Sequence, residues 1–238
     1  AGRINVLTPA TDQMFAGSTT GMTSNGSASE MGRKSYVGRL NYSYKNKYLI
    51  ESSIRADASA KFPPGSRWGF FPSVSIGWLA SEESFLKSFT ALNQLKIRGS
   101  YGQSGNDRVG NFQYLSGYQF GHPSILGSGV QAALVSTGLA NPLLTWEKLT
   151  IWNAGLDFSF WNGKLYGEFD AFYRDRTGIP ANRLTSLPST FGSPLPPENI
   201  NSLNNRGFEL KLGTQNNFGD LSWDLFGNIS WTRAKWGH

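Results

Sequence analysis

The sequence lacks several features that define common classes of protein. It contains no cysteine, which excludes a disulfide framework and a thiolate metal site. No run of 18 apolar residues occurs, so no transmembrane helix is predicted, although the strands of a membrane β-barrel would not produce such a run. Of the two histidines, His122 lies in a long predicted loop and His238 is the last residue. Neither has a nearby ligand pattern, so we predict no metal site and no cofactor.

Charge is also scarce. Charged residues make up 16% of the chain, against roughly 25% in typical soluble domains. The net charge of +6 comes from lysines and arginines that are scattered singly rather than clustered. Because no basic cluster or nucleic-acid motif is present, nucleic acid is not predicted as a partner.

Apolar and polar residues alternate with a period of two along much of the chain. Val74, Ile76 and Trp78 share one parity, whereas Ser73 and Ser75 take the other. Successive side chains of a strand point to opposite faces, so this pattern predicts strands with one apolar face. Eight strands are predicted, near residues 35–44, 48–57, 73–80, 95–103, 145–160, 165–176, 207–214 and 221–234. A short helix capped by Ser81 is predicted over residues 81–87.

The predicted connections alternate in length. Those after the first, third, fifth and seventh strands are short, and those after the second, fourth and sixth are long. In an up-and-down sheet, alternate connections lie at the same edge. Bacterial outer-membrane barrels have this asymmetry, with short periplasmic turns and long extracellular loops.

The predicted fold class is therefore all-β: a partial antiparallel up-and-down transmembrane β-barrel, present as a curved open sheet of about eight strands with two open edges. Residues 1–34 are expected to form an extracellular loop segment, and residues 35–238 the barrel part. Ala1 is not a start methionine, and the chain ends soon after a strand, so we expect an internal fragment of a longer protein.

The aromatic residues fall into two groups near opposite strand ends. The residues near the short turns are Tyr44, Tyr48, Trp78, Phe160, Trp161 and Trp223, and those toward the long loops are Trp231, Tyr173, Trp146 and Trp68. Two aromatic belts are expected where amphipathic rings lie at the headgroup level of a membrane. Ordinary packing inside a β-sandwich is the alternative.

Charged residues occupy the polar parity of the predicted strands. We expect them to form a charge-balanced network in the barrel lumen; the candidates are Arg55, Arg98, Glu168, Asp170, Arg174, Glu209 and Lys211. Glu168 and Asp170 point the same way from one strand, which is also how a glycosidase could present its carboxylates. The preferred interpretation is that they pair with Arg174 or with basic residues of neighbouring strands.

Four residues of the long connections are candidate substrate contacts: Trp68, Asp107, Arg108 and Tyr114. Aromatic rings stack on sugars, and the two charged residues are able to hydrogen-bond a polar solute; ordinary loop packing is the alternative. No catalytic residue is predicted, because residues 102–105 lack the Gly-x-Ser-x-Gly spacing of a nucleophile elbow.

Two other functions remain open at this point. A soluble β-sandwich carbohydrate-binding module would place its tryptophans on one exposed face. An outer-membrane barrel enzyme would gather a Ser/His or carboxylate constellation at one rim.

Several longer motifs resemble the barrel of the SusC/RagA-type TonB-dependent transporters of Bacteroidetes outer membranes. They are residues 35–44 (SYVGRLNYSY), 55–59 (RADAS), 67–73 (RWGFFPS), 95–102 (LKIRGSYG), 141–148 (NPLLTWEK) and 205–210 (NRGFEL). The motifs are spread over most of the chain, whereas the loops near 1–34, 111–140 and 178–204 carry no such signature.

The resemblance implies a nutrient importer in the outer membrane of a Gram-negative bacterium. Such a protein would import glycan oligomers or peptides, and it would not be an enzyme. The implied partners are outer-membrane lipid, the protein's own plug domain, the TonB complex and a surface lipoprotein of SusD type. The plug domain and the TonB box are not recognisable in this chain, which would supply a section of the barrel wall.

Overall fold

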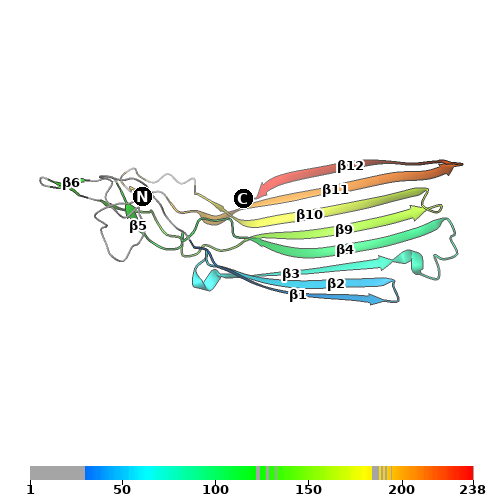
Figure 1. Ribbon diagram of the computed structural model, residues 1–238, viewed down its shortest axis with the longest axis horizontal. Coiled ribbons are helices and arrows are strands. Elements are labelled where there is room, and N and C mark those ends of the chain that lie inside the picture. The colour runs from blue at the N-terminus through cyan, green and yellow to red at the C-terminus, as the bar shows by residue number, and fades with distance from the viewer. Residues whose placement is uncertain are drawn as a thin grey trace.

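The computed structural model describes residues 30–237 except 122–123, 127–128, 132, 184–187, 189, 191 and 194. Its main feature is one antiparallel sheet with the strand order β1-β2-β3-β4-β9-β10-β11-β12 (Figure 1). The strands are β1 (Arg33–Tyr44), β2 (Tyr48–Ser59), β3 (Trp68–Leu79), β4 (Leu92–Asn106), β9 (Glu147–Phe160), β10 (Leu165–Ala181), β11 (Glu198–Phe218) and β12 (Leu221–Gly237). The edge strands β1 and β12 do not pair with each other in the described part of the chain, so the predicted open sheet is confirmed.

Several strands are longer than the sequence pattern predicts. β3 begins at Trp68 rather than near Ser73, and β11 begins at Glu198 rather than near Gly207. Residues 68–72 were expected in a loop, but they pair with β2 from Ala58↔Trp68 onward. Extended β-structure therefore continues beyond the segments in which the apolar alternation is clear.

The register of the sheet rises steadily from β1 to β12. One row of paired residues runs from Tyr44 at the first turn to Ile229 on β12. The last turn, however, begins at the pair Phe218↔Leu221. On β12 the row therefore lies beyond the turn by the distance from Leu221 to Ile229, and this displacement builds up over seven steps from strand to strand. With about 3.4 Å per residue and about 4.8 Å between strands, this stagger corresponds to a strand tilt of about 39°. Membrane barrels tilt their strands by ≈ 35–45°.

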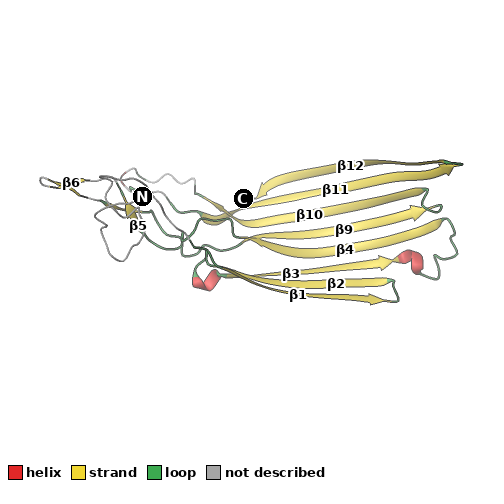
Figure 2. Cartoon of the chain, in the orientation of Figure 1, coloured by secondary structure: helices red, strands yellow, loops and turns green. Residues whose placement is uncertain are grey.

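All four turns between β1 and β2, β3 and β4, β9 and β10, and β11 and β12 lie at one end of the sheet, here called the turn rim (Figure 2). The other three connections lie at the opposite end, the loop rim. The predicted contrast in length is wrong at one place, since the β3–β4 connection (residues 80–91) is longer than the β2–β3 connection (residues 60–67). The early start of β3 shortens the latter.

The predicted helix over residues 81–87 is also wrong. The segment contains one turn of 3₁₀-helix, η3 (Ala80–Glu82), whose N-cap is Leu79 without a side-chain cap. Glu83 follows in an extended conformation, and its carboxylate accepts bonds from β2 and β3 rather than stabilising a helix start. No helix in the described residues is long and apolar enough to cross a membrane.

The 107–146 connection contains a small β-ribbon that the sequence pattern did not indicate. β5 (Tyr118–Phe120) pairs with β8 (Leu134–Ser136), and β6 (Ser124–Leu126) pairs with β7 (Gly129–Gln131). The ribbon extends away from the main sheet beyond the loop rim (Figure 1).

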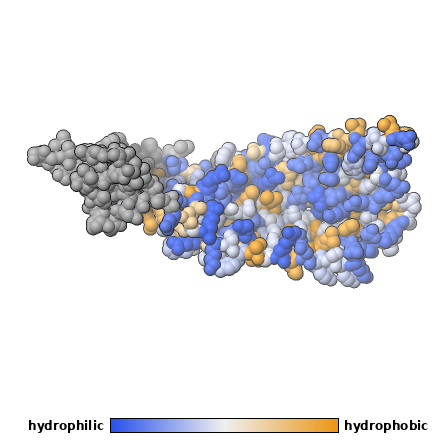
Figure 3. Space-filling view, in the orientation of Figure 1, coloured by the Kyte–Doolittle hydropathy of each residue, from blue (hydrophilic) through white to orange (hydrophobic). Residues whose placement is uncertain are grey.

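The apolar face of the sheet is not covered by other elements. Ile76 and Leu225 on this face are 59% and 66% exposed. In the view of Figure 3, apolar residues are scattered among polar ones at the surface over the strands. The buried apolar side chains of the described residues are few: Phe62, Phe71, Ala80, Leu144 and Trp146. A soluble protein rarely exposes so large an apolar surface. The β-sandwich alternative is therefore wrong, because the main sheet has no second layer packed on it in the described part of the chain.

Candidate functional site

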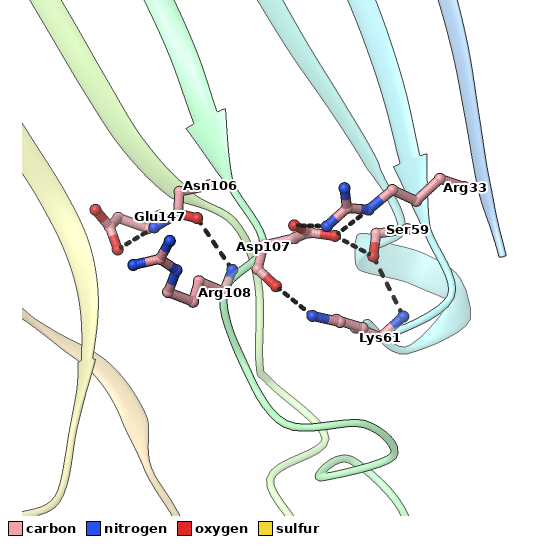
Figure 4. A network of polar contacts seen from close by, with 7 residues as sticks. All are labelled: Arg33, Ser59, Lys61, Asn106, Asp107, Arg108 and Glu147. Atoms are coloured by element: carbon pink, nitrogen blue, oxygen red, sulfur yellow. Dashed lines mark hydrogen bonds and ion pairs between the residues drawn. The ribbon is translucent and has the colours of Figure 1, made fainter. Parts of the chain in front are cut away.

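A polar network ties three strands together at the loop rim (Figure 4). Asp107, directly after β4, accepts hydrogen bonds from Arg33 Nε at 2.9 Å and from Ser59 Oγ at 2.8 Å. The second Asp107 carboxylate oxygen pairs with Arg33 Nη2, and Lys61 Nζ donates to the Asp107 carbonyl at 3.1 Å. Because the Asp107 carboxylate is buried, this charge-assisted pairing offsets its desolvation. The network fixes the point where the chain leaves β4.

The same rim is linked onward through Glu147 at the start of β9. Asn106 Nδ2 donates to Glu147 Oε2 at 3.1 Å, and Arg176 of β10 lies 3.3 Å from Glu147 Oε1. Polar contacts therefore connect β1, β2, β4, β9 and β10 at the base of the loops.

An apolar cluster lies beside this network. It consists of Phe62, Phe71, Leu144 and Trp146. The Trp146 ring lies 5.0 Å from the Phe62 ring and 5.4 Å from the Phe71 ring, and its indole N–H donates to the Arg67 carbonyl. We call these four residues the rim cluster. Trp146 was expected in the membrane belt, but it is buried, so that expectation is wrong.

The long loops are also joined to each other. Asn199 at the start of β11 donates to the Thr145 carbonyl at 2.9 Å and to the Gly178 carbonyl at 2.7 Å, while the Thr145 amide donates back to Asn199 Oδ1. Asn141 Nδ2 donates to the Pro197 carbonyl at 2.7 Å. These contacts hold the end of the 107–146 connection against the end of the 182–197 connection.

Arg98 is the centre of a charged network on the polar face of the wall. Its Nε lies 2.9 Å from Asp157 Oδ1, and its Nη1 and Nη2 lie 3.0 and 2.7 Å from the two oxygens of Asp170. Arg98, Gly155 and Asp170 occupy one row across β4, β9 and β10. A Cβ at Gly155 would lie 2.6 Å from Arg98 Cζ, so glycine leaves the space in which the guanidinium crosses β9.

Replacing Arg98 by methionine is expected to lower the free energy of unfolding of the full-length protein by about 1–3 kcal/mol, because two neighbouring carboxylates lose their shared cation. Adding Asp170→Asn should restore part of the loss. Arg174→Met is the matched control, since Arg174 lies over the Phe172 ring at 4.3 Å and forms no ion pair among the described residues. Denaturant unfolding in lipid vesicles measures all three. Equal stability of R98M and the wild type would contradict the prediction.

The other predicted lumen residues share the polar face but form smaller contacts. Arg55 pairs with Asp57 at 2.7 Å on the same strand. Lys211 lies 4.0 Å from Glu168, and Glu209 is the row partner of Asp170. Glu168 and Asp170 therefore each face a cation, and no group of three metal-ligating residues occurs in the described chain.

A groove of ≈ 500 Å³ lies over the polar face of β1–β4 and β9. Its lining includes Glu51, Lys96, Arg98 and Asn153. A concave surface on this side indicates that the sheet curves toward its polar face, as a barrel wall curves toward its lumen.

The four candidate substrate contacts are not brought together. Trp68 lies on the apolar face and stacks on Tyr36, with ring centroids 5.9 Å apart. Asp107 is buried in the rim network. Arg108 is exposed next to it, and the Tyr114 hydroxyl lies 3.4 Å from Arg67 Nη2 in the loops.

Two of the predicted aromatic residues of the turn rim, Tyr48 and Trp78, meet at Glu83. The Glu83 carboxylate accepts hydrogen bonds from Tyr48 at 2.6 Å, Lys47 at 3.0 Å and Trp78 at 3.3 Å. These bonds lower the pKa of Glu83 to about 2, so its charge persists in mildly acidic solution. Tyr44 stacks beside Tyr48, and Trp161 is exposed in the β9–β10 turn.

A second aromatic row lies nearer the loop rim on the apolar face. Tyr101, Trp152 and Tyr173 follow one another across β4, β9 and β10 at 5.6 Å between centroids. Trp231 stacks on Phe208 at 6.2 Å on the neighbouring strands, whereas Trp223 lies near the turn. Aromatic residues thus occupy two heights on this face.

Sequence reasoning missed the residues whose role depends on distant partners. Asp157, Asn199 and Glu83 join segments that are far apart in the sequence. The residue types alone do not indicate which partner each side chain contacts. Only the parity of Asp157 on its strand indicated that it faces the same side as Arg98.

Comparison with known proteins gives one consistent set of matches. Residues 5–237 match the family described as TonB dependent receptor-like, beta-barrel. The chain is 37% identical over 212 residues to the TonB-dependent receptor SusC of Bacteroides thetaiotaomicron, covering 84% of this chain and 20% of SusC. It is 33% identical over 182 residues to the TonB-dependent receptor P26 of Formosa agariphila, covering 76% of this chain and 18% of that receptor. The chain thus spans about a fifth of these relatives.

Solved structures agree on the fold. The RagAB peptide importer in its closed-closed state superposes with a TM-score of 0.75 at 24% identity, covering 87% of this chain and 22% of that one. The open-open state of the same importer gives 0.76 with the same identity and coverage. At this identity the likeness shows the fold alone.

Proposed function

The chain belongs to the TonB dependent receptor-like β-barrel family, and from this premise we propose that it forms part of the wall and the outer substrate loops of an importer of glycan oligomers or peptides. Proteins of this family lie in the outer membrane of Gram-negative bacteria, and this chain is an outer-membrane protein and not an enzyme. The prediction of a TonB-dependent receptor barrel is confirmed.

The observation that carries the proposal is the anchoring of the loop rim. The 107–146 and 182–197 connections are fixed to each other by Asn141 and Asn199, and to the wall by Asp107 and Trp146. The turn rim has short, closed connections at three of its four turns. In this proposal the loop rim faces the outside and forms the mouth through which a solute enters.

Arg108 and Tyr114 are the proposed solute contacts at this mouth. Both lie in the connection that follows β4, and the Arg108 side chain is exposed. A guanidinium and a phenol suit a polar oligomer with hydroxyl or carbonyl groups. Asp107 supports them by holding the strand exit, and Trp68 belongs to the outer face.

The choice between glycans and peptides rests on the relatives. RagAB is a peptide importer and is 24% identical to this chain, whereas SusC is 37% identical. The proposed substrate class therefore stays as glycan oligomers or peptides. We propose that the polar groove over β1–β4 and β9 faces the plug domain of the complete protein. The same proposal includes a TonB contact outside this chain and a surface lipoprotein of SusD type above the loops.

A loop replacement in the full-length transporter tests the proposal. A Gly-Ser linker in place of residues 118–136 removes the β5–β8 ribbon while leaving Asp107, Asn141 and Trp146 in position. We expect the apparent KM for uptake of the transported oligomer to rise about tenfold, which corresponds to about 1.4 kcal/mol of lost binding.

The control inserts the same linker between Gly219 and Asp220 at the turn rim, where an exposed turn tolerates insertion. Uptake should then be unchanged. If the ribbon replacement leaves the uptake of oligosaccharides and peptides at the wild-type level, the ribbon has no role in selecting the solute.

A further inference from the structure

Two arginines stand side by side on the outer face of β11 and β12. Arg206 and Arg233 are direct cross-strand partners, and they share the parity of Phe208 and Trp231. Both are exposed, and neither forms a hydrogen bond or ion pair with any described residue. Like charges at directly opposed positions destabilise a sheet. An anion bound between the two guanidinium groups would reverse this repulsion.

The height of the pair follows from the register. The last residue pair at the turn rim is Phe218↔Leu221. Arg206 and Arg233 are the same number of residues away from this pair, each along its own strand. At a tilt of about 39°, each residue rises about 2.6 Å, which places both arginines about 32 Å above the turn rim. Trp223 and Trp231 lie at about 5 and 26 Å by the same measure.

The apolar band of a membrane barrel is ≈ 25 Å tall and is bordered by aromatic residues. The two tryptophans of β12 have this separation to within about 4 Å. The arginine pair therefore lies just above the upper aromatic row, where the headgroups of the lipid leaflet at the loop rim begin.

Further basic residues lie close to this height on the same face. Lys148 of β9 is as far from the turn at Phe160 as Arg206 is from Phe218, and Lys235 of β12 lies two positions beyond Arg233. On this face and near this height, the acidic residue of the described strands is Asp175 of β10, which is only partly exposed. Four cations against one carboxylate give a local excess of positive charge.

We propose that Arg206 and Arg233, with Lys235 beside them, bind the phosphate group of a lipid in the membrane leaflet at the loop rim, which is the outer leaflet in the orientation that the proposed function assigns. Lys148, two strands away, adds to the positive charge of the surface. The planar fork of arginine matches a phosphate with two parallel hydrogen bonds. The neighbouring rings of Trp231 and Phe208 lie below and contact the acyl chains.

Lipid titration of the full-length transporter in detergent micelles tests this site. The probes are phosphatidic acid, phosphatidylcholine and inorganic phosphate, and the readout is the apparent Kd from tryptophan fluorescence or native mass spectrometry. For R206Q/R233Q we expect binding of phosphatidic acid about thirtyfold weaker than for the wild type. The loss for phosphatidylcholine should be smaller, because its choline cation offsets the charge of its phosphate. R206K/R233K should retain intermediate affinity, because the charge remains while the fork is lost.

The matched control is K45Q/K164Q, which removes two charges from exposed positions at the turn rim and should bind phosphatidic acid as the wild type does. Heat-dependent gel mobility checks that each variant is folded. Equal affinity of R206Q/R233Q and the wild type would overturn the site. Saturation by inorganic phosphate alone, at the affinity of the lipid, would also overturn it and show a free-anion site.

The orientation is tested separately by labelling a cysteine placed at Leu143, an exposed loop position, on intact cells. Labelling supports the outer-leaflet assignment. Failure to label refutes the proposed orientation of the loop rim, whereas the micelle titration still decides whether the arginine pair binds lipid phosphate.

Discussion

Replacing Trp146 by alanine is expected to lower the free energy of unfolding of the full-length transporter by about 3–5 kcal/mol, the range for removal of a large buried aromatic side chain. Trp146 is 7% exposed and contacts the rings of Phe62 and Phe71. Its indole N–H also bonds to the Arg67 carbonyl, which would lose this partner. The substitution therefore opens a cavity and leaves a polar group unpaired.

The surroundings leave little scope for the cavity to close. β3 and β4 pair only between Ser73 and Leu79, so at the loop rim the space between these two strands is filled by side chains. A Cβ at Gly105 or at Gly69 would overlap the Phe71 ring. Two glycines thus form the recess for Phe71, and Trp146 covers the ring.

Trp161→Ala provides the control for loss of an indole. Trp161 is 56% exposed in a turn and its ring lies 5.8 Å from the Phe160 ring, so a loss of about 1 kcal/mol is expected. Denaturant unfolding gives the free energies, and limited proteolysis reports on the loops. Because Trp146 directly precedes β9, W146A should also speed cleavage within residues 107–146. Equal losses for the two variants would show that the rim cluster has no special role.

The strands and their faces were predictable because they follow a local rule. A period of two is set by backbone geometry within each strand, so Ser73–Ala80 revealed both its strand and its apolar face. The short and long connections then ordered the strands. The start of β3 was missed because the alternation that marks a strand is broken before Ser73. The residues that break it are the consecutive Phe70 and Phe71 and, farther upstream, Pro63 and Pro64.

Trp146 shows why the buried residues could not be predicted. A tryptophan near a strand end fits a membrane belt equally well, and Trp146 lies just outside β9, where strand parity no longer applies. Its burial depends on Phe62 and Phe71, which belong to a distant part of the sequence. Arg98 was predicted as a charged residue of the lumen. Its two partners, Asp157 and Asp170, could not be predicted, because they depend on the register of three strands.

Leu156→Arg is expected to lower the free energy of unfolding by about 2–4 kcal/mol, because the guanidinium would face the bilayer hydrocarbon between the two aromatic rows. Leu156 has Ile97 and Phe169 as row partners on the apolar face. Measured along β9 from the turn at Phe160, it lies about 10 Å above the turn rim. This height falls between the two aromatic rows.

Two controls on the same strand separate lipid contact from steric disruption. Asn153→Arg adds the same side chain on the polar face, where it lines the groove, and should change the free energy of unfolding by less than about 1 kcal/mol. Thr150→Arg faces outward but lies farther along β9, near the height of the upper aromatic row, so a loss of about 0–1 kcal/mol is expected. Refolding titrations of the full-length transporter in lipid vesicles measure all three. A loss that depends on both face and height can arise only if the apolar side of this sheet contacts lipid, whereas equal losses at the three positions would contradict the assigned faces.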